Sequence, residues 1–154
     1  MAEAALKGWI TTPAETYYNN GVKAGITQWL PNWPNGTANP TTPTSTEVTT
    51  ALNTYLTFTG MEWDSGASLE DAMERLHIQK YYAMFLVDFQ QWFEYRRSGH
   101  PVLHKGVGLR NNGIMPARMK YPIYVQSTNP TNYKTAVANQ GTDLISTQVW
   151  WQKP

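Results

Sequence analysis

Residues 78–101 read IQKYYAMFLVDFQQWFEYRRSGHP, and their pattern indicates the fold class of the chain. Over residues 81–93 apolar and aromatic side chains occur on every side of a helix rather than along one stripe. A helix that is apolar all round is covered on all sides by other elements. Ser68 can cap such a helix, and Gly99-His100-Pro101 stops it. We therefore predict one long central helix from about Ser68 to Ser98, with the other helices packed around it.

Two further helices are predicted upstream. Thr12-Pro13-Ala14-Glu15 combines a capping residue, a proline at the first helical position and an acid at the capping-box position. This helix runs to about Leu30, and Gly21 and Gly25 within it predict close approach by a neighbouring helix. A second helix is capped by Ser45 or Thr46 and carries an apolar stripe. The stripe consists of Val48, Ala51, Leu52, Tyr55 and Leu56. Two such helices form a helical hairpin, the unit of helical-repeat proteins.

The remaining segments are predicted to be mostly irregular. Residues 31–46 are rich in proline, threonine, asparagine and glycine and form a long loop. After Pro101 glycines, asparagines and prolines are scattered to the end of the chain, with one short helix near Asn132 to Asn139. The predicted fold is thus mainly α, with helical hairpins around a central long helix and an irregular, loop-rich C-terminal region. We expect residues 1–154 to form a single unit.

The composition excludes several classes of function. The net charge is +1 without a lysine or arginine run, so we expect no nucleic-acid partner. The chain has no cysteine, which excludes disulfides and thiolate metal sites within these residues. There is no apolar run long enough to span a membrane as a helix, and the N-terminus lacks a signal-peptide pattern. Seven tryptophans and nine tyrosines are typical of a binding surface, although such residues also fill cores.

No arrangement of side chains predicts catalysis, a metal or a cofactor. His77, His100 and His104 do not have metal-ligand spacing on one helix face, and we expect them in turns and on the surface. Glu62 and Asp64 flank Trp63 and could be read as a glycosidase pair. Adjacent acids in a turn are more often turn formers.

The charged residues inside the apolar helix are expected to form ion pairs, because buried charges are normally paired. Asp88 lies within this segment and can reach a partner such as Arg118 in the C-terminal region. We predict a structural role for this pair.

Four segments resemble the SusD/RagB-like outer-membrane lipoproteins. They are Ala2-Glu3-Ala4-Ala5-Leu6-Lys7-Gly8-Trp9, the helix Tyr17-Tyr18-Asn19-Asn20-Gly21-Val22-Lys23-Ala24-Gly25-Ile26, the stretch from Ile78-Gln79-Lys80-Tyr81 to Arg96-Arg97-Ser98-Gly99-His100-Pro101, and the C-terminal Arg118-Met119-Lys120-Tyr121-Pro122, Asn129-Pro130-Thr131-Asn132-Tyr133 and Val149-Trp150-Trp151. Family members often carry a glutamate where this chain has Val125. The order of the motifs places the chain at the C-terminal end of the family, so the lipidated cysteine is expected upstream and outside this chain.

The resemblance implies a TPR-like helical fold and a non-enzymatic role in nutrient uptake. Members of the family bind glycans at the surface of the outer membrane in Bacteroidetes. They partner a SusC-like TonB-dependent transporter and are held at the membrane by the lipid anchor. Two other functions stay open for this chain: a scaffold or transporter-docking segment without ligand contact, and a polysaccharide-active enzyme.

Candidate ligand-binding residues are aromatic side chains in or beside loops, because aromatic faces stack on the apolar faces of sugars. They are Trp29, Trp33, Trp63 and Tyr124. Trp150 and Trp151 are expected to attach the C-terminal region to the helices. We assign Tyr81, Phe85, Phe89 and Trp92 to the core.

Overall fold

The structure is a computed structural model that describes residues 1–29 and 44–152. The predicted long loop, with Trp33, lies outside the described residues. Within them the regular elements are all helical, which confirms the mainly α prediction. The chain divides into two compact units, Met1–Val102 and Leu103–Pro154, and each is described by itself. That both belong to a single unit stays a prediction.

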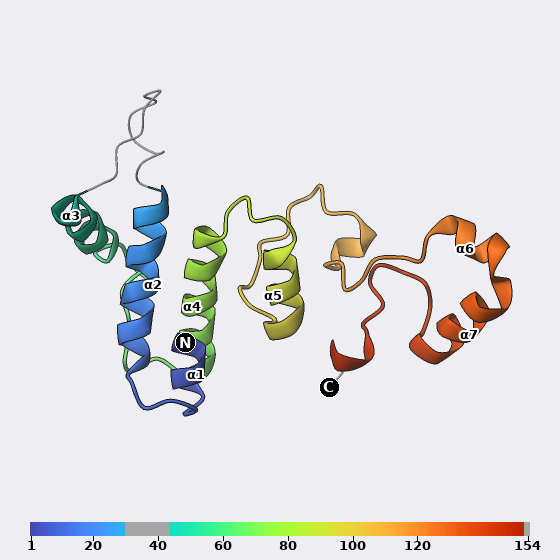
Figure 1. The fold of residues 1–154 in the computed structure, drawn as a ribbon, viewed down its shortest axis with the longest axis horizontal. Helices are drawn as coiled ribbons and strands as arrows, with labels where there is room; N and C mark the ends of the chain where they lie inside the picture. Colours follow the sequence, from blue (N-terminus) through green and yellow to red (C-terminus); the bar gives the residue numbers. More distant parts are fainter. Residues whose placement is uncertain (30–43, 153–154) are drawn as a thin grey trace, which may run out of the picture. The chain divides into compact units, whose positions relative to one another are not determined.

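The described part of the first unit, residues 1–29 and 44–102, contains five helices (Figure 1). They are α1 (Ala2–Leu6), α2 (Ala14–Trp29), α3 (Ser45–Tyr55), α4 (Leu69–Ala83) and α5 (Gln90–Ser98). Helix α2 packs against α1, α3 and α4, and α1 also packs against α4. The buried apolar side chains between them are Ala2, Tyr18, Val22, Val48, Ala72 and Met73. The small size of this set means that the first unit leaves much of its apolar surface uncovered.

The helix starts follow the expected capping chemistry. Ser68 caps α4, and its side chain accepts a hydrogen bond from the Asp71 backbone nitrogen at 3.1 Å. The cap of α3 is Thr44, one residue before the earlier of the two predicted caps, because Thr44 and Glu47 form a complete capping box. The Glu47 carboxylate accepts the Thr44 backbone N–H at 2.7 Å, while the Thr44 hydroxyl accepts the Glu47 backbone N–H.

The prediction of one long helix from Ser68 to Ser98 is wrong. Helix α4 ends at Ala83 and α5 begins at Gln90. Leu86 (φ 63°) and Asp88 (φ 46°) between them have left-handed backbone conformations, which a right-handed helix cannot contain. Apolar content alone does not reveal such a break, because the same residues suit an exposed apolar turn.

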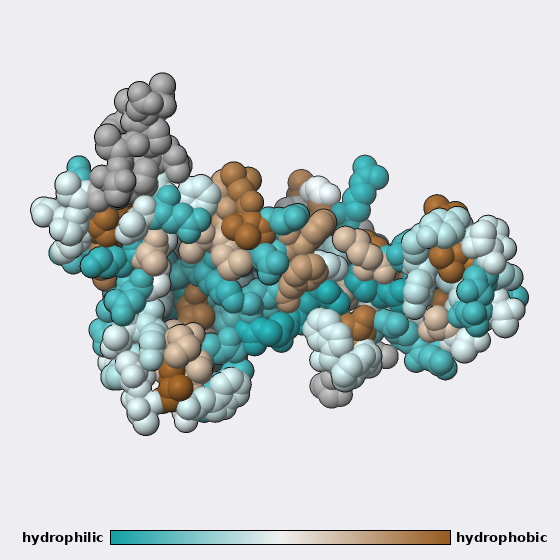
Figure 2. Space-filling view, viewed as in Figure 1, coloured by the Kyte–Doolittle hydropathy of each residue, from teal (hydrophilic) through white to brown (hydrophobic). Residues whose placement is uncertain are grey.

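The assignment of this segment to the core is also wrong for most of its rings. Phe85 is 62% exposed, Leu86 81% and Phe89 53%, and Tyr81 is exposed as well. Only Trp92, of the rings assigned to the core, is half-buried. Figure 2 shows hydrophobic atoms gathered at the surface over the connection between α4 and α5.

The predicted helix stop is confirmed at Gly99, which closes α5 in a left-handed conformation with φ 78°. The His100–Pro101 peptide bond that follows is cis. Glu74 of α4 holds this turn, because its carboxylate accepts hydrogen bonds from His100 Nδ1 at 2.9 Å and from the Val102 backbone nitrogen at 2.7 Å.

The second unit is loop-rich, as predicted. Its elements are the short 3-10 helix η2 (Asn111–Gly113), α6 (Ile123–Thr128), α7 (Pro130–Gln140) and the 3-10 helix η3 (Trp150–Gln152). The short helix expected near residues 132–139 is α7, whereas α6 was not predicted. Two irregular segments meet where the Ala117 and Arg118 backbone nitrogens donate to the Ile145 carbonyl at 2.7 and 3.2 Å. None of the described helices has the length and apolar composition needed to cross a membrane.

Candidate functional site

A cavity of about 680 Å³ opens on the first unit, and its lining includes six aromatic rings. We call it the aromatic groove. Its lining residues are Gly21, Val22, Gly25, Ile26, Trp29, Tyr55, Phe58, Met61, Gln79, Tyr81, Tyr82, Ala83 and Phe85. They come from α2, from the end of α3 and the turn after it, from the C-terminal end of α4 and from the α4–α5 turn. None of these residues carries a charge.

The two glycines of α2 make room for the groove in different ways. A Cβ added at Gly25 would lie 3.4 Å from the Ala83 Cβ, so α4 approaches α2 closely at this point. This confirms the predicted close approach at Gly25. A Cβ at Gly21 would meet nothing within 4 Å, so this glycine leaves open space on the groove wall.

Hydrogen bonds hold the rings of the groove in place. The Trp29 indole donates to the Ala83 carbonyl at 3.2 Å, one of the carbonyls that a helix end leaves without a helical partner. The Trp29 ring also meets Phe85 edge-on, at 6.2 Å between centroids. The Tyr55 hydroxyl donates to Gln79 Oε1 at 2.9 Å. Burial raises the pKa of Tyr55, so its hydroxyl stays protonated and remains a donor.

The structure describes three of the four sequence-predicted ligand residues, Trp29, Trp63 and Tyr124. Trp29 lines the groove, whereas Trp63 packs on buried Tyr18 with ring centroids 5.2 Å apart. Tyr124 is exposed on α6 in the second unit, and Trp33 lies outside the described residues. Sequence reasoning missed Tyr82 as a groove residue and assigned Tyr81 to the core. The sequence carried no signal for this role, because the predicted helix continued through both tyrosines to Ser98.

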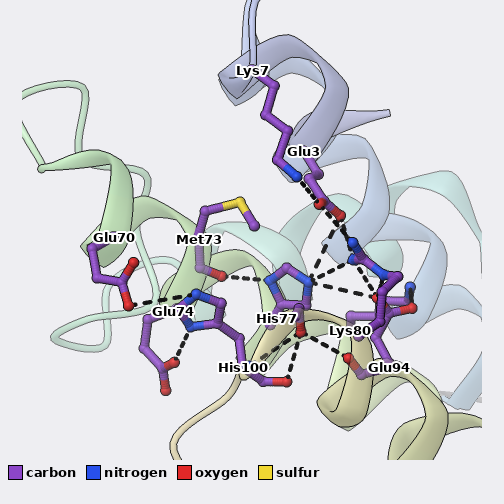
Figure 3. A network of polar contacts seen from close by, with 11 residues as sticks. Glu3, Lys7, Glu70, Met73, Glu74, His77, Lys80, Glu94 and His100 are labelled. Atoms are coloured by element: carbon purple, nitrogen blue, oxygen red, sulfur yellow. Dashed lines mark hydrogen bonds and ion pairs between the residues drawn. The ribbon is translucent and has the colours of Figure 1, made fainter. Parts of the chain in front are cut away.

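A polar network joins α1, α4 and α5 on the same unit (Figure 3). Arg97 donates from both terminal nitrogens to the Glu3 carboxylate, at 2.9 and 2.6 Å, and from Nε to Glu94 at 2.6 Å. Lys7 pairs with Glu3 at 2.9 Å, and Lys80 pairs with Glu94. Arg97 therefore links the first helix of the chain to the fifth by a bidentate contact.

His77 lies at the centre of this network and is only 1% exposed. Arg97 Nη2 lies 3.4 Å from His77 Nε2, and because a guanidinium can only donate, Nε2 is the acceptor. The ring proton is then on Nδ1, which donates to the Met73 carbonyl at 2.7 Å. His100 stacks on His77 at 5.3 Å between centroids and is buried too. The expectation of surface histidines is thus wrong for both, because each faces the packed side of α4.

The network fixes the charge states of its members. The Arg97 hydrogen bonds lower the pKa of Glu3 to about 2, although burial opposes this. Burial also opposes the shift at Glu94, but hydrogen bonds from Lys80 and Arg97 lower its pKa. Burial lowers the pKa of His77, which favours the neutral ring.

Glu3, His77 and Glu94 could in principle hold a metal ion, since their ligand atoms all lie within 4.8 Å of one another. Both carboxylates are already paired with cations, and His77 Nε2 faces the Arg97 guanidinium. A divalent ion would have to displace Arg97. The arrangement therefore fits an ion network that ties helices together better than a metal centre.

The other charged residues singled out in the sequence have structural contacts. Asp64 accepts the Gly66 backbone N–H at 2.9 Å, and the Glu62 carbonyl accepts a hydrogen bond from Arg75, as expected of turn formers. Arg118 pairs with Asp143 at 3.4 Å, so the predicted Asp88 partner is wrong. The reason is that Asp143 lies in the same compact unit as Arg118.

Comparison with known proteins identifies the family. Residues 1–122 match the SusD-like family model, whose description is "Starch-binding associating with outer membrane". The chain belongs to the SusD-like family. This confirms the resemblance drawn from the motifs. No curated protein matches the chain.

Solved SusD-like structures share the fold. A chitin-binding protein is 25% identical, with a TM-score of 0.72 over 99% of this chain and 31% of its own. A SusD homolog from Bacteroides fragilis NCTC 9343 is 26% identical, with a TM-score of 0.74 over 99% and 33%. A chitin-binding SusD homolog from Flavobacterium johnsoniae is 24% identical, with a TM-score of 0.70 over 99% and 34%. The chain thus spans about a third of the length of these structures.

Proposed function

We propose that this SusD-like chain is part of a non-catalytic, glycan-binding component of an outer-membrane nutrient-uptake system, and that the aromatic groove contacts the glycan. The family description and the chitin-binding protein at 25% identity support a glycan as the ligand. The partner would be a SusC-like TonB-dependent transporter. The protein would lie on the outer surface of the outer membrane, held there by a lipid anchor.

The aromatic lining of the groove is the observation that carries the proposal. Trp29, Tyr81 and Tyr82 present ring surfaces beside one another, and both tyrosines are exposed. Aromatic faces pack against the C–H faces of sugar rings, and the tyrosine hydroxyls offer hydrogen bonds at the edge. Because no lining residue is charged, the groove suits a neutral glycan better than an acidic one.

Calorimetric titration with chitin-derived and starch-derived oligosaccharides tests the proposal. Tyr82→Ala is the sharper variant, because its exposed ring contributes little to folding. We expect binding of one oligosaccharide series by the wild type and a loss of roughly tenfold in affinity in Tyr82→Ala and Trp29→Ala, about 1.4 kcal/mol each. The matched control is Trp9→Ala, an exposed tryptophan outside the groove. Wild-type affinity in both groove variants would exclude the groove as the glycan site.

A second function, transporter docking, is favoured by a different feature. Leu86, Val87 and Phe89 in the α4–α5 connection are apolar and exposed, and exposed apolar patches mark interaction sites. If the turn docks on a SusC-like transporter, Leu86→Asp should abolish co-purification with that transporter and leave glycan affinity unchanged. Unchanged co-purification of the Leu86 variant would remove the support for docking through this turn.

A further inference from the structure

We propose that a second, smaller pocket in the Leu103–Pro154 unit binds a single neutral sugar ring. The pocket has a volume of about 280 Å³ and is lined by Tyr121, Ala136, Asn139, Gln140 and Trp150. We call it the amide–aromatic pocket. The inference rests on the proposed function in taking a glycan as the ligand, but it concerns a different unit and different residues from the aromatic groove.

Trp150 provides an open stacking face on a locally ordered turn. Within its own unit the side chain is 80% exposed. The turn that carries it is closed by the Gln152 backbone nitrogen, which donates to the Val149 carbonyl at 2.9 Å, and by the Gln152 side chain, which accepts the Val149 N–H at 3.3 Å. An exposed tryptophan alone needs no explanation, but this one forms the wall of a concave site. The expected attachment of Trp150 to the helices stays a prediction.

Tyr121 forms a second aromatic wall, and buried neighbours hold it in place. Its backbone nitrogen donates to Asp143 Oδ1 at 3.1 Å. The Arg118 guanidinium lies 4.7 Å from its ring centroid, and Tyr133 meets the ring edge-on at 5.8 Å. Asp143 completes the set, since its carboxylate also pairs with Arg118 at 3.4 Å and accepts the Tyr133 hydroxyl at 3.3 Å. A ring fixed in this way loses little conformational entropy when a ligand binds.

The polar groups of the pocket are unoccupied by the protein itself. Among the described residues, the side-chain amides of Asn139 and Gln140 make no hydrogen bond, and neither do the Tyr121 hydroxyl and the Trp150 indole nitrogen. Each amide offers two donor hydrogens and an acceptor oxygen. Neighbouring hydroxyls on one sugar ring need this mixture of donors and acceptors, whereas an apolar ligand would leave all four groups unused.

The charge and size of the pocket narrow the ligand class. None of the five lining residues is charged, so a phosphate or carboxylate group would find no counter-charge in the lining. The volume is at the low end of the roughly 300–1,000 Å³ typical of small-molecule sites, which suits one ring rather than a chain of rings. Two aromatic walls with two free amides therefore point to a neutral pyranose.

The test is a nitrogen–proton NMR titration of the full chain with N-acetylglucosamine and, separately, with methyl glucoside. We expect saturable shifts of the Trp150 indole N–H and of the Asn139 and Gln140 side-chain amides with at least one of these sugars. Trp150→Ala should remove the amide shifts, and Asn139→Ala should weaken binding by roughly tenfold. The control, Trp9→Ala, should leave both the amide shifts and the binding affinity unchanged. Because Trp150 is exposed, its variant should keep the backbone spectrum of the folded chain.

The possible outcomes separate this inference from the proposed function. If oligosaccharides shift the Trp29 indole signal but no sugar shifts the signals of the amide–aromatic pocket, the pocket inference is overturned and the groove proposal stands. If no sugar shifts either set of signals, both are overturned. Shifts of the signals of the amide–aromatic pocket alone would support the pocket inference and contradict glycan binding at the aromatic groove. Equal or tighter binding of glucuronic acid or glucose 6-phosphate would overturn the neutral ligand class.

Discussion

At the scale of single residues, Arg97 shows why the sequence could predict a motif without predicting its contacts. The Arg96-Arg97 pair could be recognised as the end of a helix. Its bidentate partner, however, is Glu3, which is separated from it by 94 positions in the chain. Helical periodicity relates residues within one turn or two, so no local pattern could indicate this pairing. Buried His77 was missed for the same reason.

Replacing Arg97 should destabilise the first unit. Arg97→Lys keeps the charge but cannot reproduce the planar, bidentate contact with Glu3. Since Arg97 is partly exposed, we expect the free energy of unfolding to fall by about 1–2 kcal/mol. Urea unfolding followed by circular dichroism measures the change. The control is Lys23→Gln, because Lys23 is exposed on α2 and forms no ion pair among the described residues. Equal stability of Arg97→Lys and the wild type would show that the bidentate contact between Arg97 and Glu3 does not stabilise the first unit.

Acidification should reduce stability in two separate ranges. The pKa of His77 is lowered from 6.5 in the folded state, so the unfolded chain binds this proton first, and stability is lost as the pH falls below about 6.5. The pKa of Glu3 is lowered from 4.5 to about 2, so its contribution is complete above 4.5 and is lost as the pH falls toward 2.

Thermal unfolding at a series of pH values resolves these two ranges. In His77→Gln, stability should depend less on pH in the upper range, below about pH 6.5. In Glu3→Gln, stability should depend less on pH in the lower range, from 4.5 toward 2. Both expectations hold whatever the overall stability of each variant. A His77→Gln profile that is parallel to the wild type between pH 6.5 and 4.5 would show that His77 does not titrate differently on folding.

At the scale of elements, helix starts and stops were predicted better than helix continuity. The Ser68 cap and the Gly99 stop depend on local backbone chemistry, which the sequence carries directly. The break at residues 84–89 depends on left-handed conformations at Leu86 and Asp88. Leucine rarely adopts this conformation, so nothing in its identity predicted the break.

Leu86→Gly tests the break directly. In a continuous helix this change would lower the free energy of unfolding by about 1 kcal/mol. At a left-handed position glycine relieves backbone strain, so we expect stability to be unchanged or to rise by up to about 1 kcal/mol. Val87→Gly, at a neighbouring position without a positive φ, is the matched control and should be destabilising. Equal losses of stability in Leu86→Gly and Val87→Gly would contradict the helix break at this segment.

Phe89→Ala tests the exposure of the same turn. If the ring were buried in a central helix, its truncation to alanine would lower the free energy of unfolding by roughly 3–5 kcal/mol. Because Phe89 is 53% exposed and its ring lies against the rings of Trp92 and Phe93, we expect a loss of about 1 kcal/mol. Chemical unfolding of the variant decides between the two values, and a loss above about 3 kcal/mol would mean that the ring is buried.

At the scale of the whole molecule, the sequence predicted the fold class and the family better than it predicted the binding surfaces. Apolar periodicity predicted helices, and the motifs from Gln79-Lys80 to His100-Pro101 identified the SusD-like family. The groove could not be predicted, because its walls come from three helices and two connecting segments that only the fold brings together. Of the predicted ligand residues that the structure describes, only Trp29 lines it.

The most direct test of glycan binding through the aromatic groove is the calorimetric affinity of wild type and Tyr82→Ala for the same oligosaccharide. Tyr82 is exposed on the groove, so its loss should affect the ligand more than the fold. We predict affinity about tenfold weaker in Tyr82→Ala and unchanged in Trp9→Ala. Equal affinity in Tyr82→Ala and the wild type would contradict glycan binding through the aromatic groove. So would the absence of binding of either glycan series by the wild type.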